Sequence, residues 1–197
     1  MELVQRVKDI LLAPQQTWPV IDAESVSTAD LYKNYVMILA AIPAVASFIG
    51  MTIFGFSMMG VTVRVPFLSG IAQLITGYVL SLAMVFIVAL IADALAPTFG
   101  GQKNQSSALK LVAYGSTAGM LGGIASLIPS LSVLGFIAAL YSIYLIYLGL
   151  PVLMKCPQPR ALAYTAVIMV CAVIAGMLVG GVSAMFAPSH AGFSMAH

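Results

Sequence analysis

The chain contains 197 residues, of which 61% are hydrophobic and only 7% are charged, and its formal net charge is +2. Soluble domains carry roughly 25% charged residues, and a soluble fold of this size could not hide so much apolar surface from water. The small net charge also argues against nucleic acid as a partner. The composition therefore predicts an integral membrane protein.

The N-terminal segment before Pro14 has the pattern of an amphipathic helix. Its apolar residues recur at helical spacing, and they are Leu3, Val4, Val7, Ile10 and Leu11. Arg6, Lys8 and Asp9 fall on the other face. Such a helix lies in the membrane interface or packs on the protein's own loops, and the sequence supports both readings equally. Arg6, Lys8 and Trp18 are predicted to be interfacial, because amphipathic side chains suit the headgroup level.

Charged residues bound the apolar stretches and define five membrane spans, since a helix needs about 20 residues to cross the hydrocarbon core. The predicted spans are about 35–56, 67–95, 111–127, 131–154 and 162–186. The uncharged stretch between Lys110 and Lys155 is too long for one span and is divided at Pro129. The prediction is thus a single all-α domain, residues 1–197, which is a bundle of five transmembrane helices. A short amphipathic helix belongs to its cytoplasmic interfacial segment, residues 1–30.

The first span is expected to begin as one continuous helix at Ser27, because Ser27 and Asp30 have capping-box spacing. The basic residues set the orientation of the bundle. Seven of them fall on one side of the predicted topology: Arg6, Lys8, Lys33, Lys103, Lys110, Lys155 and Arg160. Only Arg64 falls on the other. Lys and Arg accumulate in cytoplasmic loops, so the N-terminus is predicted in the cytoplasm and the C-terminus outside.

Asp93 is the only acidic residue within or at the edge of a span. Ionisable residues inside a membrane are functional candidates by default. Its shallow position, close to Pro97, instead favours a structural pairing with Lys110 or Tyr147. We therefore predict that Asp93 anchors the cytoplasmic ends of spans two and three.

Uncharged polar residues mark one face of span two and one face of span four. On span two, Ser69, Gln73, Gly77 and Ser81 are four residues apart and share a face. On span four, a broad face carries Tyr141, Tyr144 and Tyr147. Tyr141 should lie near mid-membrane, where its hydroxyl needs a partner such as Gln73 or Thr76.

Glycines also recur at four-residue spacing, which lets helix backbones approach closely. Those predicted to pack helices are Gly77, Gly115, Gly119, Gly123, Gly176 and Gly180. Tight packing within one bundle is the preferred interpretation. A homodimer seam or a substrate path is the alternative.

No motif in the sequence indicates catalysis, a cofactor or a metal site. The chain is accordingly predicted not to be an enzyme. Cys156 and Cys171 are expected to be buried thiols, with palmitoylation of Cys156 as the alternative. Four residues near the C-terminus have soft-ligand chemistry but match no strong metal motif: Met185, His190, Met195 and His197.

Three segments of the chain carry a resemblance to a known family. They are Leu12-Ala13-Pro14 through Thr17-Trp18 to Ile21 and Glu24, Phe99-Gly100-Gly101 followed by Ala108 through Tyr114, and Ala139 through Pro151. In order and spacing the chain resembles the YIP-domain family, five-span membrane proteins named after interaction with Ypt/Rab GTPases. It departs from the family's pattern at Thr117-Ala118-Gly119, where a proline would follow the Ser-Thr pair. This departure puts a kink in span three in doubt.

The resemblance implies a scaffold, because eukaryotic members act in vesicle trafficking and membrane shaping. The short N-terminal tail resembles the bacterial branch, which implies the cytoplasmic (inner) membrane of a bacterium and gives no basis for Rab binding. The expected partners are the lipid bilayer and either a second copy of the chain or other membrane proteins. The alternative function is a small transporter or channel that uses the polar faces of spans two and four. A continuous hydrated cavity at Gln73 would favour that alternative.

Overall fold

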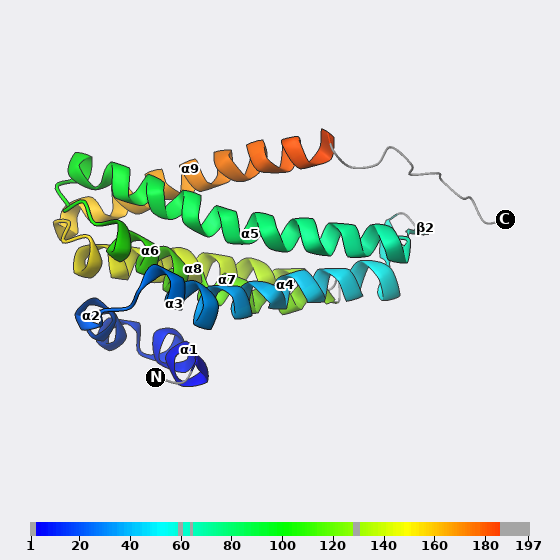
Figure 1. The fold of residues 1–197 in the computed structure, drawn as a ribbon, viewed down its shortest axis with the longest axis horizontal. Coiled ribbons are helices and arrows are strands. Elements are labelled where there is room, and N and C mark those ends of the chain that lie inside the picture. Colours follow the sequence, from blue (N-terminus) through cyan, green and yellow to red (C-terminus); the bar gives the residue numbers. More distant parts are fainter. Residues whose placement is uncertain (1–2, 59–60, 64, 128–130, 186–197) are drawn as a thin grey trace.

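The computed structural model describes residues 3–58, 61–63, 65–127 and 131–185, and it gives side-chain surroundings for these except 56–58, 61–63, 132 and 178–185. Long helices lie side by side in one bundle, and two short N-terminal helices lie against its side (Figure 1). The elements are α1 (Leu3–Leu12), α2 (Pro14–Ala23), α3 (Thr28–Leu31), η1 (Tyr32–Val36), α4 (Met37–Ile49), η2 (Gly50–Phe54), β1 (Phe56–Met58), β2 (Val61–Val63), α5 (Phe67–Leu95), η3 (Ala96–Phe99), α6 (Gln105–Gly115), α7 (Thr117–Gly122), η4 (Gly123–Leu127), α8 (Ser132–Leu153) and α9 (Gln158–Met185).

Four helices in the described ranges are long and apolar enough to cross a membrane: Thr28–Phe54, Phe67–Phe99, Val133–Leu153 and Gln158–Met177. They coincide with the first, second, fourth and fifth predicted spans. Each has outward apolar side chains that are at least 50% exposed, for example Ile38, Val79, Phe136 and Val173. Apolar surface of this extent is stable in lipid rather than in water. The fold is therefore a helical membrane bundle.

The first span begins where its capping pair predicts. The Ser27 side chain accepts a hydrogen bond from the Asp30 backbone N–H, with 3.1 Å between donor and acceptor. From there the helix runs without a break through α3, η1, α4 and η2 to Phe54. It then ends at Gly55, whose φ of 74° is a conformation that glycine adopts easily.

A short hairpin that was not predicted from the sequence follows this helix. Its strands β1 and β2 pair antiparallel, with Phe56 opposite Val63 and Met58 opposite Val61. The hairpin lies at the end of the bundle far from α1 and α2 (Figure 1). Arg64, the lone basic residue of that side in the predicted topology, lies outside the described residues.

The third predicted span is broken into short pieces at Ser116, between α6 and α7. The side chains there bond back to their own helix, because the Ser116 hydroxyl donates to the Ala113 carbonyl at 3.2 Å and the Thr117 hydroxyl to the Tyr114 carbonyl at 2.7 Å. Such local bonds bend or interrupt helices. The break therefore occurs without a proline, and the five-span count stays a prediction. The predicted division at Pro129 lies outside the described residues.

The most deeply buried part of the molecule surrounds α6. Every residue of α6 from Ala108 to Gly115 is buried, and α6 packs against α5, α8 and α3. This core lies toward the end of the bundle where α1 and α2 dock (Figure 1).

Small residues allow the broken third segment to approach its neighbour α8. A Cβ on the glycines of this segment would come within 2.5, 3.2 and 2.3 Å of a side-chain atom of α8. The contacts pair Gly115 with Ile146, Gly119 with Ser142 and Gly122 with Ala138. The partners on α8 are four residues apart and run in the opposite direction, so the glycines form one antiparallel seam.

The remaining predicted packing glycines lie in different surroundings. Gly123 turns away from α8, and a Cβ there would be 2.4 Å from the Pro43 Cβ of α4. Gly77 and Gly176 have no atom within 4 Å of an added Cβ. The prediction that these two pack helices closely is therefore wrong within this chain, because Gly77 lies at the wall of an open cavity between α4 and α5 and Gly176 is exposed. Gly180 lies in the part of α9, residues 178–185, whose side-chain surroundings are not described.

Candidate functional site at the N-terminal segment

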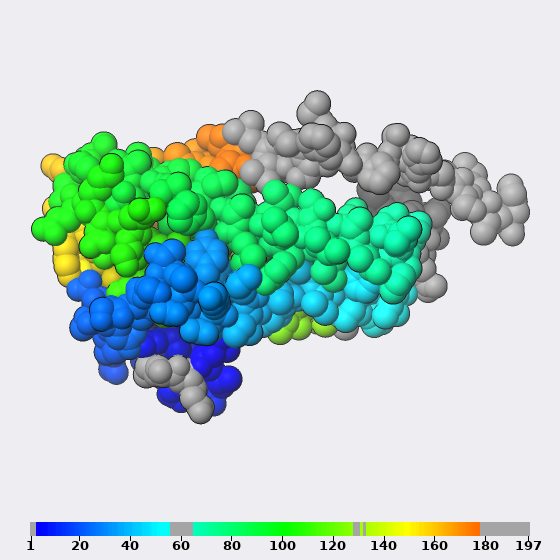
Figure 2. Space-filling view, in the orientation of Figure 1, coloured from blue at the N-terminus to red at the C-terminus, as the bar shows by residue number. Residues whose placement is uncertain are grey.

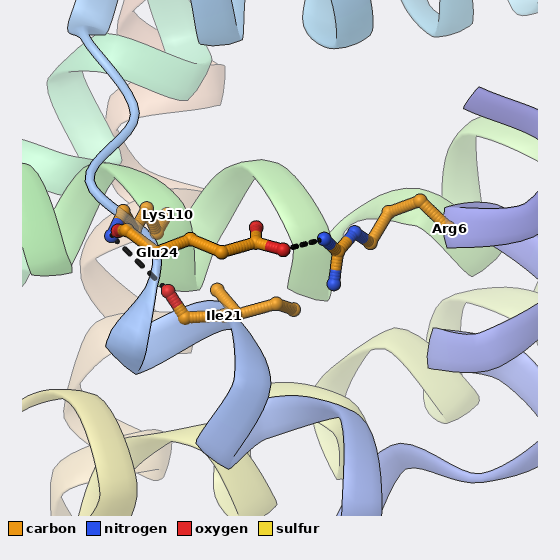
Figure 3. Close-up of polar contacts among 4 residues, drawn as sticks. All are labelled: Arg6, Ile21, Glu24 and Lys110. Carbon is orange, nitrogen blue, oxygen red and sulfur yellow. Dashed lines mark hydrogen bonds and ion pairs between the residues drawn. The ribbon is translucent and has the colours of Figure 1, made fainter. Parts of the chain in front are cut away.

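A polar cluster that we call the Glu24 cluster joins α1, the end of α2 and α6. It consists of Arg6, Glu24, Lys110 and the Ile21 carbonyl (Figure 3). Arg6 forms an ion pair with the Glu24 carboxylate. The Lys110 ammonium donates to the Glu24 carbonyl and, at 3.1 Å, to the Ile21 carbonyl. These bonds fasten the N-terminal segment to the buried helix α6.

The cluster supplies a hydrogen-bond donor to backbone carbonyls that the end of a helix leaves unpaired. The last carbonyls of a helix have no intrahelical donor, and a cation near them is favoured by the helix dipole. Here α2 ends at Ala23 with Glu24 as its C-cap residue, and Lys110 supplies the cation. Lys110 is only 6% exposed and Arg6 only 4% exposed. This arrangement was not predicted from the sequence, although a basic residue at position 110, within an otherwise apolar stretch, was a signal of it.

Burial of Arg6 corrects its predicted place on the outward face of α1. Its guanidinium carbon lies 5.8 Å from the centre of the Tyr114 ring, a cation–π distance. The Tyr114 and Tyr35 rings are 4.5 Å apart, and the Tyr35 hydroxyl bonds Thr117 at 2.7 Å. The inner face of α1 is thus linked to α6, and through Tyr114 and Tyr35 to η1 and α7. Lys8 is exposed, and its interfacial position stays a prediction.

Trp18 is fully buried and not at an exposed interfacial position, so that prediction is wrong. Its ring packs where α2 crosses α8, and a Cβ on Gly149 would be 2.8 Å from the Trp18 ring and 2.6 Å from Leu111. Only a glycine lets the indole approach α8 this closely. Trp18 therefore fixes α2 on the bundle instead of anchoring it in the headgroups.

Tyr141 bonds the N-terminal helix, which corrects the partner predicted from span two. Its hydroxyl donates to the Leu11 carbonyl at 2.7 Å, and this carbonyl lies in the last turn of α1, where carbonyls need a donor. Neither Gln73 nor Thr76 takes part. Tyr144 lies beside Tyr141, with ring centres 5.8 Å apart, and Tyr147 is partly buried. Through Tyr141 the docked α1 is tied to α8 as well as to α6.

Asp93 is buried, at 9% exposure, but it does not pair as predicted. Across the described ranges no hydrogen bond or ion pair joins it to Lys110 or Tyr147, and its Oδ1 has no partner there. The Lys110 ammonium is instead engaged by α2. Next to Asp93, the Tyr164 hydroxyl donates to the Ala92 carbonyl. The predicted Asp93 ion pair between the ends of spans two and three is therefore not formed.

The polar face of span two lines a cavity of about 360 Å³ between α4 and α5. Gln73, Gly77 and Ser81 contribute to its wall together with apolar residues of α4. Thr76, Tyr141 and Tyr144 do not line it. The polar faces of spans two and four, which the transporter hypothesis combines, therefore lie apart in this structure.

The connection between α8 and α9 meets the N-terminal segment. Lys155 forms an ion pair with Asp22 of α2 at 2.5 Å, and both side chains are substantially exposed. The neighbouring Cys156 is buried, at 4% exposure, and burial raises the pKa of its thiol. A buried, protonated thiol is a poor acceptor for an acyl chain, so palmitoylation at this position is not supported. Cys171 is half-buried.

No group of three or more His, Cys, Asp or Glu residues that could hold a metal ion occurs in the ranges that the structure describes. The soft-ligand residues of the C-terminal tail, His190, Met195 and His197, lie outside those ranges.

The apolar helices, the α6 core and the docked N-terminal segment together define a polytopic helical membrane protein. Residues 8–190 match the family model described as the Yip1 domain, and the chain belongs to this family. It is 25% identical over 157 residues to the inner membrane protein YohC of Escherichia coli K12, which covers 78% of this chain and 80% of YohC. YohC of Escherichia coli O6:H1 strain CFT073 is equally similar. No solved structure matches the chain.

Proposed function

We propose that this chain is a non-enzymatic scaffold that organises the lipid bilayer, and that its docked N-terminal segment is the part that acts on lipid. One observation carries the proposal. While the inner face of α1 is fixed to the bundle, Val4 is 60% exposed, Leu12 is 83% exposed and, on α2, Val20 is 47% exposed. Amphipathic helices that present apolar residues in this way insert shallowly into the headgroup region.

The segment is placed at the cytoplasmic face in this proposal. Contacts between Asp22 and Lys155 and between Glu24 and Lys110 bring three of the basic segments to one end of the bundle. Because basic segments are retained in the cytoplasm, the N-terminus is inside and the C-terminus outside. The similar YohC proteins are named inner membrane proteins, which supports the inner membrane of a bacterium as the location.

Val4→Ser combined with Leu12→Ser tests the proposal because it removes outward apolar surface without touching the docked face. We expect the wild-type protein to narrow the diameter distribution of liposomes, as seen by cryo-electron microscopy, and the double variant to leave it unchanged. Gln5→Ser is the matched control, since Gln5 is an exposed polar residue of the same helix. Liposome shaping by the double variant at the wild-type level would contradict the scaffold proposal.

The transporter or channel alternative rests on the cavity at Gln73. That cavity is lined mainly by apolar residues of α4 and α5, and Tyr141 is engaged by α1. These two observations favour the scaffold. An oligomer fits the same proposal, because the exposed Gly176 leaves room for a second copy to approach α9.

A further inference from the structure

A second cavity, of about 490 Å³, lies between α1 and the beginning of the first span. We call it the α1 cavity. Its wall is formed by Arg6 of α1, Glu24 after α2, Asp30 of α3, Asn34 and Tyr35 of η1, and Tyr114 of α6. In Figure 2, α1 and the start of the first span lie on the same face of the molecule. The volume of the α1 cavity is within the range of small-molecule sites, roughly 300–1,000 Å³.

Arg6 lies at the wall of this cavity and carries an unused hydrogen-bond donor. Its Nη2 atom binds Glu24, whereas its buried Nη1 atom has no partner among the described residues. A buried donor that is left unsatisfied is costly, and a charged one more so. Guanidinium groups suit phosphate oxygens, because their fork of donors matches the phosphate geometry. A phosphate beside Arg6 in the α1 cavity would bring an acceptor to this guanidinium group.

The other charges of the wall select the occupant. Arg6 contributes one positive charge, while Glu24 and Asp30 contribute two negative charges. A simple anion would face both carboxylates, and like charges at short range repel. An occupant that carries both a phosphate and an ammonium group matches the wall, because the phosphate complements Arg6 and the ammonium group complements Glu24 and Asp30. The Tyr35 and Tyr114 rings add faces that attract an ammonium group.

The edge of the cavity points to a lipid as the source of this group. Leu3 and Ile38 lie at the wall, and Ile38 is 50% exposed on the apolar surface of the first span. A headgroup in the cavity could therefore keep its acyl chains along that surface. We propose that the α1 cavity binds the phosphoethanolamine headgroup of a bilayer lipid. The inference rests on the proposed function, since it requires α1 to lie in the membrane interface.

Native mass spectrometry of the full chain with phosphatidylethanolamine and phosphatidylglycerol tests this proposal. We expect the wild-type protein to bind phosphatidylethanolamine about tenfold more tightly than phosphatidylglycerol, a difference of about 1.4 kcal/mol.

Three variants separate the contributions of the wall. Arg6→Gln should weaken the binding of phosphatidylethanolamine by about tenfold. Asp30→Asn should abolish the preference between the two lipids while the chain stays folded. Asp30 is exposed, its backbone N–H still donates to the Ser27 cap, and an amide oxygen can still accept from the Ser27 hydroxyl. Lys8→Gln, on α1 but outside the cavity, is the matched control and should bind as wild type.

Three results would overturn the proposal: no lipid preference in wild type, an unchanged preference in Asp30→Asn, or free phosphoethanolamine competing as strongly as the intact lipid. The last result would identify a soluble ligand. The readout is separate from liposome shaping. A headgroup preference without liposome shaping would support the lipid site and contradict the scaffold function. Liposome shaping without a headgroup preference would support the scaffold function and contradict the lipid site.

Discussion

Replacing Glu24 by alanine is expected to lower the free energy of unfolding by about 3 kcal/mol, because it leaves the Arg6 guanidinium buried without a counter-charge. Removing one partner of a buried ion pair typically costs about 3–5 kcal/mol. The Arg6 side chain is 5% exposed but that of Glu24 is 33% exposed, so the lower end of this range applies. Unfolding of the detergent-solubilised protein, followed by circular dichroism against denaturant, measures the effect.

The same segment contains a matched control. Asp22→Ala removes the partner of Lys155, but these side chains are 30% and 47% exposed. An exposed ion pair contributes at most about 1 kcal/mol. Equal losses of unfolding free energy in the Glu24 and Asp22 variants would show that burial does not distinguish the two ion pairs. They would also show that the Glu24 cluster does not hold the N-terminal segment in place.

Gly123→Ala is expected to destabilise the protein by about 2–3 kcal/mol. The new Cβ would lie 2.4 Å from the Pro43 Cβ and 3.0 Å from the Pro43 Cα. The proline ring is rigid and belongs to the middle of α4, so η4 and α4 would have to separate. Overpacking of a well-packed core typically costs about 1–3 kcal/mol, and the stiff neighbour places this site at the upper end. The same denaturant titration measures it.

Gly77→Ala makes the same chemical change where no atom lies within 4 Å. Alanine is favoured over glycine inside a helix by up to about 1 kcal/mol, so this variant should be as stable as wild type or slightly more stable. A loss of stability at Gly77 that matches the loss at Gly123 would contradict the open space beside Gly77. It would indicate that a second copy of the chain packs there.

The membrane architecture was largely predictable because it depends on properties that sequence carries directly. Runs of apolar residues bounded by Lys33, Asp93 and Lys155 locate long helices, and the bilayer fixes their length. The start at Ser27 was predictable for a similar reason, since capping depends on neighbours along the chain. The break at Ser116 was not, because hydroxyl groups within a helix either bend it or are accommodated, according to the packing around them.

The candidate site was predictable only in part, since its residues meet across long stretches of chain. Arg6 was assigned to the polar face of α1 by helical periodicity. Its counter-charge, Glu24, lies beyond a second helix, and no local pattern signals that the pair would be buried. Tyr141 was correctly expected to need a hydrogen-bond partner. The partner turned out to be a backbone carbonyl of α1, which no side-chain pattern can reveal.

Reading Trp18 as an interfacial anchor failed for a related reason. An indole ring suits both a headgroup layer and a protein core. The choice depends on whether the facing helix offers space, and here Gly149 of α8 provides it. Membership of the YIP-domain family was predictable because the resemblance rests on short segments in a fixed order along the chain. The docking of the N-terminal segment, by contrast, depends on the three-dimensional meeting of those segments.

The central claim is that α1 and α2 are part of the packed bundle, with the Lys110 ammonium covered by the end of α2. Lysine-reactive labelling in lipid nanodiscs, read by mass spectrometry, tests it most directly. Lys110 is 6% exposed, whereas Lys103, which precedes the same helix, is exposed. We expect Lys103 to be labelled and Lys110 to stay unmodified until Glu24→Ala loosens the segment. Labelling of Lys110 at the rate of Lys103 in the wild-type protein would contradict the account.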